Sequence, residues 1–163
     1  MPFDRGFIVA AALLAGLVAV ELFGFRYLPM VDLPQHAAQL SSWVHLDDPA
    51  FGFREQFEIN WRTPYLLVYL LARPFVPLLG VLGALKVTIF VAVIATFAAY
   101  LLLIRSVEQD PWISLLAFPL SFGFSFYFGF LNFLLATPIV ITVIVLALRF
   151  GRRPDARGGV RLG

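Results

Sequence analysis

The residues best suited to chemistry gather in one polar segment, residues 26–64. This segment holds eight of the chain's 22 charged residues, both of its histidines and two of its three tryptophans. Asp32 and His36 stand four residues apart near its beginning. At that spacing on a helix a carboxylate and an imidazole are neighbours, so Asp32 is a candidate general base and His36 a second candidate catalytic group.

Each of these residues also has a purely structural interpretation. Asp32 precedes Pro34, which suits the first turn of a helix. The Asp32 side chain is therefore equally suited to capping that helix, a contribution of about 1 kcal/mol. For His36, pairing with Asp32 or simple solvation is favoured over a catalytic role. Both interpretations of Asp32 stay open at this point.

The composition excludes an ordinary soluble domain. Hydrophobic residues make up 61% of the chain, charged residues 13%, and the mean hydropathy is +0.89. Soluble domains carry charge on about a quarter of their residues. The chain is therefore expected to be an integral membrane protein, with room in its 163 residues for roughly four or five spans. Because it has no cysteine, disulfides and thiolate metal sites are excluded.

Apolar stretches predict an all-α polytopic fold of about five transmembrane or re-entrant helices. They cover residues 7–25, 64–81 and 84–104, and two further segments within 112–150. The first resembles a signal peptide, but its length and lack of a small-residue cleavage site favour an uncleaved span. Pro74 and Pro77 are expected to kink or interrupt the second. Glu21, near the end of the first, is expected to reach headgroups or pair with Arg26 rather than to act in chemistry.

The polar segment is expected to form an extramembrane loop with interfacial helices over residues 26–63. A helix over 34–46 would place three apolar residues on one face, namely Ala37, Leu40 and Val44. With Trp43 beside that face, this helix would lie in the membrane interface. Asp47 and the following Asp-Pro pair are expected to stop it. Residues 51–60 fit either a second surface helix or an extended piece.

Residues 118–133 form an aromatic passage interrupted by Gly123 and Gly129. This composition disfavours a straight helix. The passage fits either an aromatic belt around a turn at the membrane interface or a groove for a lipid tail, and the belt is favoured. Asn132, at the start of the helix that follows, is typical of an interhelical hydrogen-bond partner.

Arginines cluster in a tail, residues 151–163, that is expected to be disordered at the end of a single membrane domain, residues 1–163. Such a cluster suits lipid headgroups better than nucleic acid. Five crossings from a cytoplasmic amino terminus would place the tail outside, against the positive-inside tendency. Either residues 112–130 are re-entrant, or the tail is the stub of a truncated chain, which is favoured. Both alternatives keep the polar segment outside.

Two short motifs resemble a known family. Residues 32–36 read Asp-Leu-Pro-Gln-His shortly after the first span, and residues 129–133 read Gly-Phe-Leu-Asn-Phe at the start of a later one. With the long polar loop and the closely spaced spans, they resemble the amino-terminal part of the GT-C superfamily, in particular its uncharacterised bacterial members. These are integral-membrane glycosyltransferases that use polyprenyl-phosphate sugars. Many members carry a second acidic residue in the first loop, where this chain has Leu33 and Pro34.

The resemblance implies a transferase of the bacterial inner membrane that moves a sugar from a polyprenyl-phosphate donor, or a truncated or inactive form of one. Asp32 and His36 would be catalytic, with Asp32 also the candidate ligand of a divalent cation, Mg²⁺ or Mn²⁺. Three arginines would bind the donor phosphate, namely Arg54, Arg62 and Arg73. Membrane lipids and the donor are the expected partners, and nucleic acid is not.

The alternative is a non-enzymatic membrane protein, either a scaffold subunit or a transporter fragment. An enzyme predicts that Asp32, His36 and at least one arginine converge on one cavity open to lipid, whereas a scaffold predicts scattered polar side chains. A transporter predicts ionisable residues at mid-membrane and paired broken helices. The sequence offers Arg73 near mid-span and no visible internal repeat, which counts against the transporter.

Overall fold

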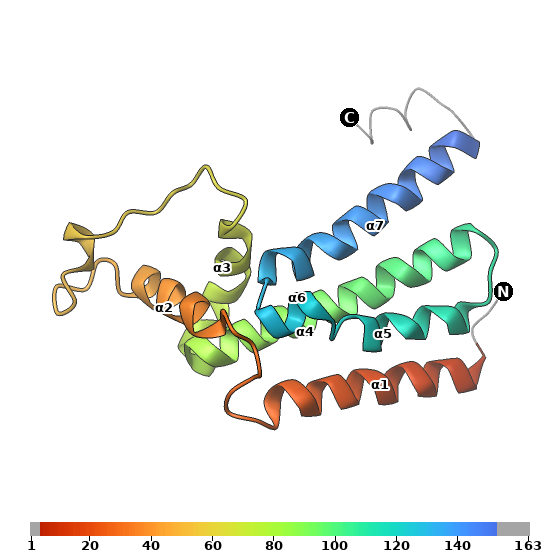
Figure 1. Ribbon diagram of the computed structural model, residues 1–163, viewed down its shortest axis with the longest axis horizontal. Coiled ribbons are helices and arrows are strands. Elements are labelled where there is room, and N and C mark those ends of the chain that lie inside the picture. The colour runs from red at the N-terminus through yellow and green to blue at the C-terminus, as the bar shows by residue number, and fades with distance from the viewer. Residues whose placement is uncertain (1–3, 153–163) are drawn as a thin grey trace.

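The computed structural model describes residues 4–152, and within them all regular structure is helical. Long helical stretches lie side by side in a bundle, with short helices and an irregular loop gathered at one end (Figure 1). In chain order the elements are α1 (Arg5–Phe23), α2 (Leu33–Val44), η1 (Phe53–Glu55), α3 (Leu66–Ala72), η2 (Arg73–Phe75), α4 (Val76–Ser106), η3 (Pro111–Leu116), α5 (Ala117–Leu120), α6 (Phe124–Phe128) and α7 (Leu131–Arg152).

Four stretches in the described part of the chain are long and apolar enough to cross a membrane. They are Arg5–Phe23, Leu66–Ser106, Pro111–Phe128 and Leu131–Arg152. The chain therefore has the fold of a polytopic helical membrane protein, which confirms the predicted class. The number of candidate crossings in the described residues is four, compared with the expected count of about five.

The difference in count lies in residues 64–81, which hydropathy alone treats as a separate span. α3 ends after seven residues, and the 3₁₀ turn η2 separates it from α4. Pro74, inside η2, has no N–H to continue the helix, so the expected interruption at the prolines is confirmed. Gly80 then kinks the beginning of α4, with φ 68° and ψ 176°. Together α3, η2 and α4 form one bent crossing.

α4 is the central element of the bundle. It packs against α1, α2, α3, α5 and η3, and along most of α7. Its buried face combines small and branched residues, namely Ala84, Leu85, Ile89, Ala92 and Val93. The facing residues of α7 include Leu131, Leu134 and Leu135. Small side chains allow close approach of helices in lipid, where packing rather than water exclusion holds them together.

The crossing between α4 and α7 is broken, as the composition of the aromatic passage predicts. It consists of η3, α5 and α6 and runs the length of the bundle beside α1 and α4 (Figure 1). Gly123 stands between α5 and α6 in an extended conformation. Gly129 ends α6 in the left-handed region, with φ 81°. These interruptions supply backbone carbonyls that are free to bond other segments.

α2 confirms the helix predicted over 34–46, although it begins one residue earlier and ends two residues earlier. Leu40 is fully buried, and Ala37 and Val44 pack against the core, so the predicted apolar face is the buried one. Between α2 and α3 the helical element is the single turn η1, and neither proposed form of residues 51–60 is present over its whole length.

α1 begins and α7 ends at the same end of the bundle, opposite α2 and α3 (Figure 1). Side-chain hydrogen bonds connect the segments at that end. The Trp112 Nε1 donates to the Asp4 carboxylate over 3.3 Å, and the Arg152 Nη1 donates to the Ser106 carbonyl over 2.6 Å. Gly151 and Arg152 belong to α7. The rest of the tail predicted to be disordered lies outside the described residues.

Candidate functional site

The two motifs that carry the family resemblance meet at the start of α2. The backbone N–H groups of Val31 and Asp32 donate to the carbonyls of Tyr127 and Phe128, each over 3.0 Å. Gly129 makes this contact possible, because a Cβ at its position would lie 3.0 Å from the Asp32 nitrogen. The beginning of α2 is thus fixed to the end of α6, about a hundred residues later in the chain.

His36 connects three segments through its ring. Its Nε2 lies 3.0 Å from the Gly129 carbonyl oxygen, and its Nδ1 lies 2.8 Å from the Tyr69 hydroxyl. The carbonyl can only accept, so Nε2 carries a hydrogen. The Tyr69 hydroxyl in turn bonds the side-chain oxygen of Gln39. Helices α2 and α3 and the turn after α6 are therefore joined at one imidazole.

The hydrogens of this network are limited in number. Tyr69 has one hydroxyl hydrogen, so it cannot donate both to Gln39 and to an unprotonated Nδ1. Both bonds form together when Nδ1 is protonated, or when Gln39 presents its amide nitrogen instead of its oxygen. Burial lowers the pKa of His36, and the hydrogen bond to Gly129 and the negative charge of Asp32 oppose that shift. Burial therefore disfavours the protonated imidazole.

Asp32 occupies the N-cap position of α2, but its side chain makes no capping hydrogen bond. The carboxylate is partly buried and close enough to His36 to influence its protonation. The structural interpretation of Asp32 as a side-chain cap is thus not realised. The predicted neighbourhood of Asp32 and His36 on one turn of helix is present, since the His36 N–H bonds the Asp32 carbonyl over 3.0 Å.

A divalent cation at Asp32 would have few protein ligands. Within residues 4–152 there is no group of three or more histidine, aspartate or glutamate side chains placed to hold a metal. Both ring nitrogens of His36 are already engaged by Tyr69 and Gly129. These residues alone therefore do not fit a protein-built metal site. The divalent cation expected at Asp32, Mg²⁺ or Mn²⁺, therefore stays a prediction.

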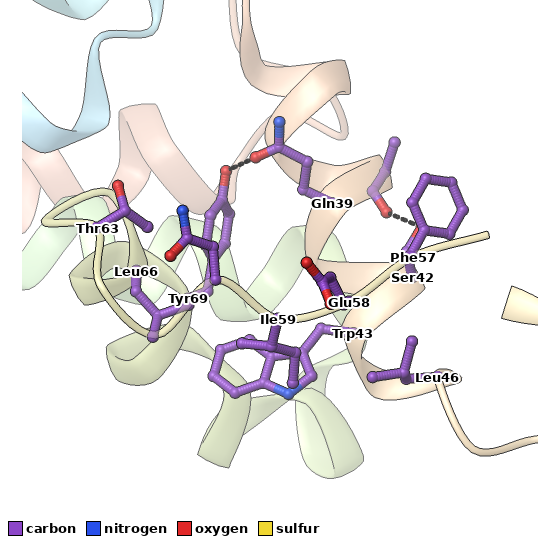
Figure 2. Close-up of a pocket in the computed structure, with 12 residues that line it drawn as sticks. Gln39, Ser42, Trp43, Leu46, Phe57, Glu58, Ile59, Thr63, Leu66 and Tyr69 are labelled. Carbon is purple, nitrogen blue, oxygen red and sulfur yellow. Dashed lines mark hydrogen bonds between the residues drawn. The ribbon is translucent and has the colours of Figure 1, made fainter. Parts of the chain in front are cut away.

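A pocket of about 440 Å³ opens beside this network (Figure 2). α2 lines it with Gln39, Ser42 and Trp43, and α3 lines it with Tyr69. Residues 57–63 run across it and add a carboxylate, an amide and a hydroxyl from Glu58, Asn60 and Thr63. The walls are otherwise apolar. A mostly apolar hollow with a few polar groups is the usual form of a small-molecule site.

The three arginines predicted to bind phosphate occupy different places. Arg54 pairs with Asp47 on the exposed surface of the loop. Arg62 is exposed in the loop that runs across the pocket. Arg73 lies with its guanidinium carbon 5.4 Å from the centre of the Trp43 ring. The structure thus places one of the three, Arg73, directly against a residue that lines the pocket.

Two residues of the site, Tyr69 and Gln39, had no part in the sequence-based prediction. Tyr69 is the one hydroxyl in an otherwise aliphatic helix, which is the available signal. Gln39 stands three residues after His36 and so shares its face of α2. Their pairing with His36 is a contact between distant segments, which periodicity does not reveal.

Comparison with protein-family models, with curated proteins and with solved structures finds no match for this chain.

Proposed function

We propose that the chain is a glycosyltransferase-like membrane protein that binds the sugar-phosphate head of a polyprenyl-phosphate donor in the pocket between α2, residues 57–63 and α3. The observation that carries the proposal is the stacking of Arg73 on Trp43, 5.4 Å from guanidinium carbon to ring centre, since Trp43 lines that 440 Å³ pocket. A guanidinium pairs well with phosphate oxygens, and an indole covers the apolar face of a sugar ring.

The polar groups of the pocket suit the rest of such a headgroup. Gln39, Glu58 and Asn60 offer donors and acceptors to sugar hydroxyls. Trp61 meets Trp43 edge to face at 6.0 Å, which extends the aromatic surface beyond the pocket. Tryptophans also favour the membrane–water boundary, where the phosphate of a prenyl lipid lies. Apolar surfaces of the bundle are available to the prenyl chain.

The transfer step is assigned to Asp32. The acceptor hydroxyl attacks the anomeric carbon, its proton passes to the carboxylate, and the bond from carbon to phosphate oxygen breaks with its electron pair on the phosphate. His36 acts as a positioning residue, because its ring nitrogens are held by Tyr69 and Gly129. Asp32, His36 and Arg73 are not among the residues that line the pocket, so these side chains do not form the single cavity expected of an enzyme. The pocket therefore supports donor binding, and transfer by Asp32 is tested separately.

Binding is tested with the full chain in nanodiscs and a radiolabelled short-chain polyprenyl-phosphate sugar. We expect saturable binding that weakens on the order of tenfold in Arg73→Gln, the effect of losing one charge-assisted hydrogen bond. Trp43→Ala should also weaken binding. The matched control is Trp112→Phe, which changes the tryptophan at the opposite end of the bundle and should bind as the wild type does.

Transfer is tested separately with Asp32→Asn. Wild-type turnover that persists in Asp32→Asn would remove this carboxylate from catalysis. If the wild type binds the donor but transfers no sugar, the chain is an inactive form. Absence of saturable binding in the wild type contradicts the proposed function and leaves the scaffold interpretation.

A further inference from the structure

A second hollow, of about 430 Å³, lies between α1 and the broken crossing. α1 contributes Leu14, Leu17, Val18 and Glu21, which share one helix face because they are spaced at i, i+3, i+4 and i+7. The opposite wall is aromatic, with Phe118 and Phe122 from the passage that the sequence singled out. This groove is separate from the pocket of the proposed function.

The groove has a polar end and an apolar end. Glu21 lies two residues before the end of α1, on the side of the bundle that carries α2, and Tyr127 of α6 lines the groove with it. Leu14 lies seven residues earlier, roughly 10 Å deeper along the helix at 1.5 Å per residue. The groove therefore changes from polar to apolar in the direction in which a lipid enters one leaflet.

Glu21 is exposed and makes no ion pair within residues 4–152. The cations at this end of the bundle are directed elsewhere. The guanidinium of Arg26 lies 5.3 Å from the centre of the Tyr27 ring, and the Nζ of buried Lys86 donates to the Phe25 carbonyl. The expected pairing of Glu21 with Arg26 is thus not made. A carboxylate near the hydrocarbon of a membrane is costly unless a cation or headgroup reaches it.

We propose that this groove binds phosphatidylethanolamine, with one acyl chain along Leu14, Leu17 and Val18 and the ammonium group at Glu21. The charge of Glu21 selects a cationic group and disfavours anionic lipids, including a polyprenyl phosphate. A primary ammonium has N–H groups that donate directly to the carboxylate, whereas the quaternary ammonium of phosphatidylcholine has none. The Tyr127 hydroxyl is a further hydrogen-bonding group at the headgroup end.

The experiment is native mass spectrometry of the full chain, released from nanodiscs that contain equal amounts of phosphatidylethanolamine, phosphatidylcholine and phosphatidylglycerol. We expect the protein to retain phosphatidylethanolamine at least about tenfold over the other two, the ratio given by one charge-assisted hydrogen bond. Equal retention of phosphatidylethanolamine and phosphatidylcholine by the wild type would overturn the proposal without any variant.

Three variants locate the site. Glu21→Gln should abolish the headgroup preference, and because this side chain is exposed the exchange leaves packing intact. Leu17→Trp, at a position that is 56% exposed, fills the groove and should reduce retention of lipids generally. Glu55→Gln, an exposed glutamate in η1, should behave as the wild type does. If the preference for phosphatidylethanolamine survives in Glu21→Gln, or is lost equally in Glu55→Gln, Glu21 is not the headgroup ligand. A co-purifying protein that is lost in Glu21→Gln would instead show that a partner helix occupies the groove, which also rejects the proposal.

Discussion

His36 is the side chain on which the candidate site most depends, since its two nitrogens hold α3 and the turn after α6 to α2. Its position one helical turn after Asp32 was readable from the sequence. Its partners were not, because Tyr69 and Gly129 are 33 and 93 residues away. Local spacing predicts neighbours on one helix, whereas a hydrogen bond between helices depends on how the helices pack.

The lowered pKa of His36 predicts a loss of stability in acid. The folded protein favours the neutral imidazole. Around and below pH 6.5, the ordinary pKa of histidine, the unfolded chain therefore binds more protons than the folded one. Stability should therefore fall as the pH decreases from about 7 to the lowered folded-state pKa. Thermal unfolding of the wild type between pH 7.5 and 5 measures this effect.

The controls for that measurement are the two histidine variants. His36→Gln removes the titrating ring and should flatten the dependence on pH over this range. His45→Gln changes the other histidine of the chain, which lies outside the network, and should keep the wild-type dependence. The same acid sensitivity in all three proteins would show that His36 is not its source.

Gly129 is the second residue with a specific structural requirement. Its φ of 81° is unfavourable for a side chain, and a Cβ would also press on the Asp32 backbone. Gly129→Ala should therefore destabilise the protein by about 1–3 kcal/mol and loosen the start of α2. Unfolding in increasing SDS, followed by tryptophan fluorescence, measures the change. Gly16→Ala is the control, because a Cβ there meets nothing within 4 Å.

At the scale of elements, hydropathy located the apolar stretches but did not show how they divide. Residues 64–81 are as apolar as a membrane span, yet α3 ends at Ala72. The chain then continues through η2 into α4. A proline inside a hydrophobic stretch predicts a break, but not whether the chain turns back after it. That outcome depends on the packing of α3 against α4 and α7.

The kink in α4 leads to a prediction at this scale. Gly80 adopts a backbone conformation that is essentially restricted to glycine, while a Cβ there would have open space around it. Gly80→Ala should cost about 1–3 kcal/mol through conformation alone. Because α3 carries Tyr69, the variant should also weaken donor binding in the assay described above. A variant as stable as the wild type would show that the kink is dispensable.

At the scale of the whole molecule, the conflict created by five crossings would not arise if the four candidate stretches are the ones that cross. Arg5, Arg105, Arg149 and Arg152 all belong to the end of the bundle opposite α2. From the positive-inside tendency we expect that end to be cytoplasmic and the site to lie on the outer face. The outward-facing polar segment stays a prediction, and hydropathy alone did not indicate an even number of candidate crossings.

This topology is testable by cysteine labelling, because the chain contains no cysteine of its own. Gln56→Cys should react with a membrane-impermeant maleimide from outside, whereas Val107→Cys and Gly151→Cys should react only after the cytoplasmic side is opened. Five crossings would instead put all three cysteines outside. A re-entrant 112–130 would put position 107 outside and position 151 inside, so the three patterns are distinct.

The attachment of α2 to the turn after α6 has a consequence for biosynthesis. The N–H groups of residues 31 and 32 leave the ribosome nearly a hundred residues before the carbonyls of residues 127 and 128, which accept their hydrogen bonds. Until the third crossing has been inserted, the start of α2 lacks these two acceptors, and the polar segment is held only by its contacts with α3 and α4. Nascent chains arrested before residue 127 should be cut by protease within this segment, and finished chains should resist.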